Sequence, residues 1–482
     1  MPEGRAGMKQ KLPLSRDTRT IQKTPTQIQG LDAILHGGLP TQRMTLITGG
    51  PGTGKSLLGL EFAYRGAVAG EPGLFVTFEE PGENIRQNAA TLGWDLEALE
   101  QAGSLFVLDA RVDPEVVLSG DFNLGGLLAI LEAKARDMGA RRVVIDALDG
   151  LMRFFEEPNQ ERNQLLVLHQ RLMEQGLTVV FTSKAQGRNG TGCPHDFLDF
   201  LADCVLVLDQ EIKGRIATKT LRVIKYRGSP YGGNAYPFLV TGEGCRFHPV
   251  TDMVMRYEAP LRVTTSGNRD LDAMLGGGYH QGRCVLIVGA PGTGKTTLAS
   301  TFVRAACENG EKVFYVSYEE SQAGLIQGMR SVGIDLEPTL ESACLEILPL
   351  MPESTGVEEH LFLLHQVMER FQPDHLVVDA ISACHRMGGE AAAFDFLIRL
   401  VSTCREQGIT VLLINQTRGG EEDQEFSGIG LSSIIDTLVT LHYREVEDEI
   451  QRFLLVLKAR GKSHSTRYHR FFLADHGLEI ER

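Results

Sequence analysis

An internal duplication constrains this chain more than any other feature. The first half contains GLDAILHGGLPTQRMTLITGGPGTGKS and the second contains DLDAMLGGGYHQGRCVLIVGAPGTGKT. Further pairs follow in the same order: LFVTFEEP and VFYVSYEES, VVIDAL and LVVDAI, LRVIKYRG and LLVLKARG. Lys55 and Lys295 are 240 positions apart, whereas Lys225 and Lys458 are 233 apart, so the spacing holds except for seven residues of one loop. A repeat of this length indicates that one domain was duplicated.

Each half alternates short apolar strands with amphipathic helices. In the first half the pattern predicts a helix over Lys55–Val68. Strands apolar throughout and separated by helices are typical of a mostly parallel sheet covered on both faces. We therefore expect two α/β domains, 25–255 and 256–482, after a disordered basic tail, 1–24. The strands predicted for the first half are MTLIT, Leu74–Phe78, Leu105–Leu108, Val143–Ile145, Thr178–Phe181, Cys204–Leu208 and a hairpin-like run, Leu221–Tyr226.

Two glycine-rich loops predict phosphate binding. GGPGTGKS and GAPGTGKT both match G-x-x-x-x-G-K-[ST], and each follows an apolar strand and precedes a helix. Glycines let the backbone turn its N–H groups toward phosphate oxygens, and the lysine offsets the charge of the β and γ phosphates. The predicted ATP-binding residues are Gly50, Pro51, Gly52, Thr53, Gly54, Lys55, Ser56, Ala290, Pro291, Gly292, Thr293, Gly294, Lys295 and Thr296.

Acidic residues at strand ends supply the rest of an ATPase site. Asp146 and Asp379 end apolar strands, and with the hydroxyls of Ser56 and Thr296 they are expected to hold Mg²⁺. A lone aspartate there could instead cap a helix. The pairs Glu79–Glu80 and Glu319–Glu320 end the strand that follows each loop, where a carboxylate can accept a proton from an attacking hydroxyl. Adjacent acids can also be merely solvated, but their recurrence at the same offset favours catalysis.

The last motif of each half has two basic residues at alternating positions. In a β-strand, residues two positions apart lie on the same face. The basic residues are Lys225 and Arg227 in the first half and Lys458 and Arg460 in the second. Two interpretations stay open: an exposed basic edge, or contact with the γ-phosphate of ATP held by a neighbouring subunit.

Composition limits the partners. The net charge of −14 disfavours nucleic acid as a partner, since such proteins usually present a basic surface. No apolar run reaches the length of a membrane span. The eight cysteines form no CxxC pair and are expected to be reduced thiols of a cytoplasmic protein.

The double P-loop, the FEE and YEE glutamates, TLGWDL and the two K-x-R-G strands together resemble the KaiC family, from about Met44 to the end of the chain. The resemblance implies two tandem RecA-like P-loop domains in a two-tiered hexamer with ATP at the subunit interfaces. It also implies a slow ATPase in the first half, and a second half that phosphorylates and dephosphorylates its own serine/threonine pair.

The resemblance places that pair at Ser432 and Ser433, shortly before Asp436. The first half has Asp199 and Phe200 at the matching positions, so only the second half has acceptors. The serines could instead cap a helix or turn. The resemblance also places Arg386 opposite the acceptor and Val332 where the family has an aromatic residue against adenine.

The resemblance implies a KaiB-like partner. KaiA-type regulation is not expected, because the sequence ends at Arg482, soon after the last predicted strand. Most of the C-terminal segment that KaiA binds in the family therefore has no counterpart here. Two other functions stay open: a nucleotide-switched signalling scaffold without kinase output, and a RecA- or DnaB-like DNA-dependent ATPase. No basic, aromatic-bearing loop for a single strand supports the latter.

Overall fold

The chain divides into two compact units. One consists of Met1–Glu211 with Lys219–Val250, and the other of Thr251–Arg482 with Ile212–Thr218. The predicted junction between residues 255 and 256 lies outside the described residues. The computed structural model describes residues 21–111, 124–155, 158–184, 196–213, 216–247, 262–417, 433–474 and 477–481.

The N-terminal tail is shorter than predicted at its C-terminal end. Strand β1 (Lys23–Thr24) pairs antiparallel with β2 (Leu39–Pro40). The Lys23 ammonium donates to the carbonyl oxygen of Leu35 at 2.6 Å and to Ser229 Oγ at 2.7 Å. These two hydrogen bonds hold Lys23 against the folded unit, whereas its composition alone predicted a solvated tail. Residues 1–20 lie outside the described part of the chain.

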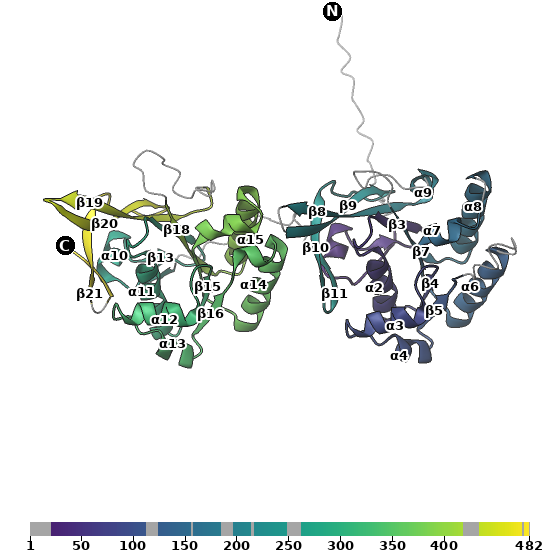
Figure 1. The fold of residues 1–482 in the computed structure, drawn as a ribbon, viewed down its shortest axis with the longest axis horizontal. Coiled ribbons are helices and arrows are strands. Elements are labelled where there is room, and N and C mark those ends of the chain that lie inside the picture. Colours follow the sequence, from purple (N-terminus) through teal and green to yellow (C-terminus); the bar gives the residue numbers. More distant parts are fainter. Residues whose placement is uncertain are drawn as a thin grey trace, which may run out of the picture. The chain divides into compact units, whose positions relative to one another are not determined.

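The first unit is built on a nine-stranded sheet in the order β11–β10–β9–β8–β3–β7–β6–β4–β5 (Figure 1). Strand β3 pairs in parallel with β7 and β8, and the pairs β6–β7, β4–β6 and β4–β5 are also parallel. Antiparallel pairing joins β9, β10 and β11. The strands are β3 (Met44–Gly49), β4 (Gly73–Thr77), β5 (Leu105–Asp109), β6 (Arg142–Asp146), β7 (Thr178–Lys184), β8 (Cys204–Lys213), β9 (Ile216–Tyr226), β10 (Ala235–Thr241) and β11 (Gly244–Phe247).

Helices cover both faces of this sheet. Successive residues of β3 enter different cores, Ile47 on one face and Leu46 on the other, as the two-residue strand period requires. Helices α2 (Lys55–Val68), α3 (Gly82–Ala90) and α4 (Leu96–Gln101) pack on the first face. The second face carries α6 (Leu124–Met138), α7 (Leu148–Met152), α8 (Pro158–Glu174) and α9 (Asp196–Leu201).

The second unit repeats this plan. Its sheet order, β16–β15–β17–β18–β14–β19–β20–β21–β22, matches that of the first unit strand for strand. The strands are β14 (Cys284–Gly289), β15 (Val313–Ser317), β16 (Leu345–Pro349), β17 (His375–Asp379), β18 (Thr410–Gln416), β19 (Thr437–Val446), β20 (Glu449–Ala459), β21 (His469–Ala474) and β22 (Gly477–Ile480). The helices are α10 (Arg269–Met274), α11 (Lys295–Glu308), α12 (Gln322–Arg330), α13 (Glu337–Glu341), α14 (Val357–Phe371) and α15 (Glu390–Glu406), with 3₁₀ turns η1 (Pro352–Ser354) and η2 (Ile381–Met387).

The predicted fold class is confirmed: both units are mostly parallel α/β sheets with antiparallel strands at one side. Helix α2 begins and ends at the predicted residues. Strands β8 and β9 are longer than the predicted runs. Their polar outer segments continue the pairing although they carry no apolar signal. Within the described part of the chain, no helix is both long and apolar enough to cross a membrane.

Candidate functional site

The first P-loop joins β3 to α2. Gly54, with φ of 101°, is the residue before the helix, a backbone conformation that glycine adopts without strain. The Lys55 ammonium donates to the carbonyl oxygen of Gly50 at 2.7 Å, and Thr53 Oγ1 donates to the same oxygen at 2.9 Å. The lysine side chain therefore folds back over the loop, which places its charge where phosphates would lie.

The second P-loop has the same geometry. Gly294 precedes α11 with φ of 99°. Lys295 Nζ and Thr293 Oγ1 each donate to the carbonyl oxygen of Ala290 at 2.8 Å. Burial lowers the pKa of both Lys55 and Lys295, and nearby carboxylates oppose the shift, foremost Asp146 and Asp379 respectively. Each lysine thus lies within the field of the aspartate predicted to bind metal.

These two aspartates are buried at the ends of β6 and β17. Asp146 is 3% exposed and Asp379 is 8% exposed. Thr182 Oγ1 donates to Asp146 Oδ1 at 2.6 Å, and Thr296 Oγ1 donates to Asp379 Oδ2 at 2.8 Å. Burial raises the pKa of both carboxyls, while the neighbouring hydroxyls, including that of Ser56 beside Asp146, oppose the shift.

The residues present fit Mg²⁺. Each site joins a buried carboxylate to a P-loop hydroxyl, and both are the hard oxygen ligands that Mg²⁺ prefers. A carboxylate in an apolar surrounding is also stabilised by a nearby cation. Among the described residues, no cluster of three or more His, Cys, Asp or Glu forms a separate metal cage. A metal that keeps waters and phosphate oxygens as ligands needs no such cage.

The acidic pairs lie just beyond β4 and β15 rather than on them, and in the first unit the two members contact different partners. Lys184 Nζ donates to Glu79 Oε1 at 2.6 Å, and Arg153 lies 3.6 Å from the same oxygen. Glu80 instead accepts from Asn88 Nδ2 at 2.7 Å, on α3. The structure therefore turns Glu79 toward Lys184 and Glu80 toward α3, and the catalytic role given to both residues stays a prediction.

In the second unit Glu319 opens onto a pocket of about 380 Å³. Pro291 of the P-loop, Arg386 of η2 and Gln416 at the end of β18 line the same pocket. Burial, and then the charge of Asp379, raise the pKa of Glu319, while Lys295 and Arg386 oppose the shift. A carboxylate with a raised pKa is a better proton acceptor near neutral pH. Glu319 and the next residue, Glu320, both have exposed side chains.

The basic pairs lie away from the P-loops of their own units. Lys225 Nζ donates to the carbonyl oxygens of Asp199 and Phe200 at 2.6 and 3.2 Å, and Arg227 donates to the Phe200 oxygen at 2.9 Å. The two side chains share a face as predicted, although Arg227 lies just beyond β9. In the second unit Arg460 likewise follows β20 and lies 3.8 Å from Asp436.

Two basic residues that the sequence analysis did not select do contact the P-loops. Lys219 Nζ donates to the carbonyl oxygen of Gly52 at 3.0 Å, and Arg452 Nε donates to that of Gly292 at 3.4 Å. They occupy matching positions, since 219 plus 233 is 452. Lys225 lies six residues beyond Lys219 on β9, which at 3.3 Å per residue separates their Cα atoms by about 20 Å.

Other site residues escaped the sequence analysis because no pattern marks them. Lys184 and Arg153 pair with Glu79 only through the tertiary fold. Tyr315 donates to Asp379 Oδ2 at 2.8 Å from inside an apolar strand, where tyrosine is an ordinary core residue. The recurrence of a basic residue at Lys219 and Arg452 is the one signal that could have revealed a further contact.

The predicted phosphorylation segment is only partly described. Ser433 is exposed, three residues before the buried Asp436. Ser432 lies outside the described residues. In the first unit Phe200, which matches Ser433, is 76% exposed. Val332, the residue predicted against adenine, is half-buried against the apolar core beside α12.

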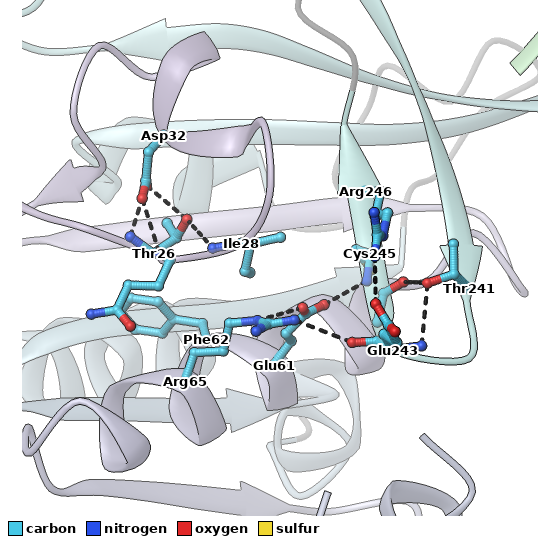
Figure 2. Close-up of polar contacts among 12 residues, drawn as sticks. Thr26, Ile28, Asp32, Glu61, Phe62, Arg65, Thr241, Glu243, Cys245 and Arg246 are labelled. Carbon is cyan, nitrogen blue, oxygen red and sulfur yellow. Dashed lines mark hydrogen bonds and ion pairs between the residues drawn. The ribbon is translucent and has the colours of Figure 1, made fainter. Parts of the chain in front are cut away.

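The helix that begins at the first P-loop is anchored at its middle by a buried acid. Figure 2 shows Glu61 and Arg65 of α2 reaching the turn between β10 and β11. Glu61 accepts from Arg65 Nε and from the Cys245 backbone N–H, each at 2.7 Å. Arg65 also donates to the carbonyl oxygen of Glu243 at 3.1 Å. These bonds hold α2, whose first residue is Lys55, against the edge strands β10 and β11 of the sheet.

Comparison with known proteins agrees with this geometry in both halves. The KaiC family of ATPases matches residues 24–252 and again residues 264–482. The circadian clock protein KaiC2 of Synechocystis sp. (strain ATCC 27184 / PCC 6803 / Kazusa) is 37% identical over 465 residues, which cover 96% of this chain and 82% of that protein. The circadian clock oscillator protein KaiC of Synechococcus elongatus (strain ATCC 33912 / PCC 7942 / FACHB-805) is 35% identical over 465 residues, 96% of this chain and 90% of that protein. With two P-loop sites and near-complete coverage, the chain belongs to the KaiC family of ATPases.

Proposed function

We propose that the first unit of this ATPase hydrolyses ATP, and that the second transfers the γ-phosphoryl group to Ser432 and Ser433 of an adjacent subunit and also removes it. The observation that carries the proposal is the pocket beside Glu319. Its lining combines a proton acceptor, the P-loop and the guanidinium of Arg386, with room for an incoming hydroxyl.

The proposed chemistry is the same in-line displacement in both units. Lys55 or Lys295 offsets the charge of the phosphates, and Mg²⁺, when bound to Ser56 and Asp146 or to Thr296 and Asp379, neutralises charge on their oxygens. Glu79 accepts a proton from water. Glu319 accepts a proton from the seryl hydroxyl, which its raised pKa favours.

Position along the strands supports action between subunits. Lys219 contacts its own P-loop, whereas Lys225 lies about 20 Å further along β9, on the geometry of an extended strand. We therefore propose that the Lys225–Arg227 and Lys458–Arg460 pairs complete the ATP site of a neighbour in a ring of six subunits. The names of the relatives make a role in a circadian clock part of the same proposal. The resemblance to the KaiC family adds a KaiB-like partner to it.

Phosphosite mapping tests the kinase. Purified protein is incubated with Mg²⁺ and γ-labelled ATP, beside the double variant Ser432→Ala/Ser433→Ala and beside Glu319→Gln. We expect label on one or both serines of the wild type and at least about a hundredfold less in either variant, because each removes the acceptor or the base. Glu79→Gln is the matched control, since it removes the equivalent acid of the other unit and leaves the label in place.

The opposite result is equally clear. Phosphate release without labelled protein would show a tandem ATPase and favour the signalling scaffold. Stimulation of hydrolysis by single-stranded DNA, lost at high salt, would favour the DNA-dependent ATPase.

A further inference from the structure

An aspartate lies beside the arginine of the basic pair in each unit. In the second unit Asp436 is 3% exposed, and Arg460 Nη1 lies 3.8 Å from its Oδ1. The Arg460 backbone N–H also donates to the Asp436 carbonyl oxygen at 2.9 Å. In the first unit Arg227 Nη1 lies 3.9 Å from Asp203 Oδ1, and the Arg227 N–H donates to the Asp203 carbonyl oxygen at 2.8 Å. The same arrangement therefore recurs in both halves of the duplication.

Each aspartate is bonded to the strand that leads into the P-loop of its own unit. The Asp436 N–H donates to the carbonyl oxygen of Cys284, the first residue of β14, at 2.9 Å. The Cys284 N–H donates in return to Asp436 Oδ2 at 3.1 Å. In the first unit the Asp203 N–H donates to the carbonyl oxygen of Met44, the first residue of β3, at 2.9 Å. The sheet thus fixes both carboxylates, and a fixed group can orient a more exposed neighbour.

A second arginine contacts each aspartate from the other side of the chain repeat. Arg283 Nη1 donates to Asp436 Oδ1 at 3.4 Å, and Arg43 Nη1 donates to Asp203 Oδ1 at 3.1 Å. The two arginines match, since 43 plus 240 is 283. Each carboxylate therefore offsets the charge of two guanidiniums that would otherwise repel each other.

The second unit adds a contact with the predicted phosphorylation segment. Arg405 of α15 donates to Asp436 Oδ2 at 2.7 Å and to the carbonyl oxygen of Ile434, the residue after Ser433. The first unit has Met173 at the matching place, since the carbonyl oxygen of each accepts from the glycine three residues later. The aspartate of the second unit therefore joins the basic pair to the chain that follows the acceptor serines.

We propose that Asp203 and Asp436 are positioning residues for the ATP site of the neighbouring subunit, because each orients the arginine that reaches that site. The separations of 3.9 and 3.8 Å are longer than a hydrogen bond, so the carboxylate acts through its charge. An arginine that is already oriented loses less conformational freedom when it meets a phosphate. The inference rests on the proposed action of the basic pairs between subunits.

The variant Asp436→Asn tests the second site, in a Glu79→Gln background so that only this site turns over. It removes the charge but keeps the size of the side chain and an oxygen for the Cys284 N–H. We expect kcat for ADP formation to fall about tenfold and KM to change by less than about twofold, because a misplaced arginine weakens the transition state more than nucleotide binding.

Glu445→Gln is the matched control. It removes a carboxylate from the exposed end of the same strand, β19, and should leave kcat unchanged. Unchanged kcat in Asp436→Asn as well would overturn the inference.

Mixing with an inactive chain shows which subunit carries the defect. Asp436→Asn protein is exchanged with an equal amount of Lys295→Ala protein, at constant total protein and in the same background. Random mixing leaves about one quarter of interfaces with an intact P-loop facing an intact aspartate, so turnover should rise about two- to threefold above Asp436→Asn alone. If the aspartate supports only the P-loop of its own subunit, the inactive chain dilutes the active one and turnover falls by about half. That fall would overturn the inference.

The first unit supplies a second variant with fewer contacts at the aspartate. Asp203→Asn is exchanged with Lys55→Ala, both in a Glu319→Gln background, and hydrolysis of ATP is measured. We expect the same rise on mixing, and this result depends neither on kinase activity nor on the acceptor serines. A rate that falls by about half would refute the role of Asp203.

The failure of this inference differs from the failure of the proposed function. If Arg460→Ala and Lys295→Ala proteins recover no turnover when mixed, the proposed action between subunits is wrong and the inference falls with it. If that mixture recovers but the mixture with Asp436→Asn does not rise, the sites between subunits hold and the role given to the aspartates is wrong.

Discussion

Glu61 carries a carboxylate into the interior of the first unit, on the helix that begins at the P-loop lysine. Its side chain is fully buried, and Arg65 and the Cys245 N–H are its partners. A Cβ at Gly244 would lie 2.5 Å from Glu61 Oε1, and Gly244 also has φ of 119°, so only glycine fits this turn. The second unit has Thr301 at the matching position, since 61 plus 240 is 301. The buried acid is therefore particular to the first unit.

Glu61 gives the first unit a pH-dependent stability. Burial raises the pKa of this carboxyl above its ordinary value, and the bonds from Cys245 and Arg65 only partly oppose the shift. Between the unfolded and the folded pKa the folded state holds more protons, so this contribution to stability is present at low pH and is lost as pH rises. Since glutamine resembles the protonated form, Glu61→Gln should cost more stability at pH 5 than at pH 8. Thermal melts of both proteins across this range measure the difference, and Thr301→Val serves as the control in the other unit. A pH-independent difference would contradict this account.

At the scale of elements, the start of β6 is tied to three other segments by one buried guanidinium. Arg142 is fully buried, and it donates to Glu71 Oε2, to the Phe62 carbonyl oxygen at 2.9 Å and to the Pro25 carbonyl oxygen at 2.9 Å. A Cβ at Gly66 would lie 2.4 Å from Arg142 Cδ, so the guanidinium needs glycine on α2. Strand β17 has His375 at the same place, 2.8 Å from Glu311.

Removal of this guanidinium should destabilise the first unit strongly. Arg142→Ala leaves the half-buried Glu71 and two carbonyl oxygens without their donor, a loss of about 3–5 kcal/mol in the free energy of unfolding. Urea unfolding followed by hydrogen exchange of α2 and β6 measures it. The adjacent Arg141 is exposed, and Arg141→Ala should change stability by less than about 0.5 kcal/mol. Comparable losses in both variants would show that the contacts of Arg142 contribute little.

Much of the element pattern could be predicted from the sequence, because strands apolar throughout and two P-loops leave few alternatives. The limits of α2 agree to the residue. The side chains around Glu79 and Glu319 could not be predicted in the same way. Glu79 and Glu80 look equivalent in sequence, and only the turn after β4 sends one to Asn88 and the other to Lys184. The sequence around Lys184 does not indicate that its side chain pairs with Glu79. The roles given to all these residues stay predictions.

At the scale of the whole molecule, the proposed sites between subunits predict complementation. Arg460→Ala and Lys295→Ala should each abolish second-site turnover by itself. Random mixing in a ring leaves about one quarter of interfaces with an intact P-loop facing an intact Arg460, so mixtures should recover about that share of activity. Turnover measured after exchange of subunits, in a Glu79→Gln background, tests this. A chain carrying both changes is the control, because it cannot complement. No recovery from the mixture would remove the assignment between subunits.

The two ends of strand β9 carry basic residues with different proposed roles, Lys219 and Lys225. The same is true of β20, with Arg452 and Lys458. One end bonds to the phosphate loop of its own subunit, and the other, in the proposed ring, meets the nucleotide of the next. In that ring, β9 or β20 would connect two consecutive nucleotide sites. Loss of the γ-phosphate at one site would change the P-loop contact at one end of this strand, and so the position of the basic pair that reaches the neighbouring site. In the proposed ring, turnover at one site would therefore be coupled to turnover at the next, and a single chain would lack this coupling.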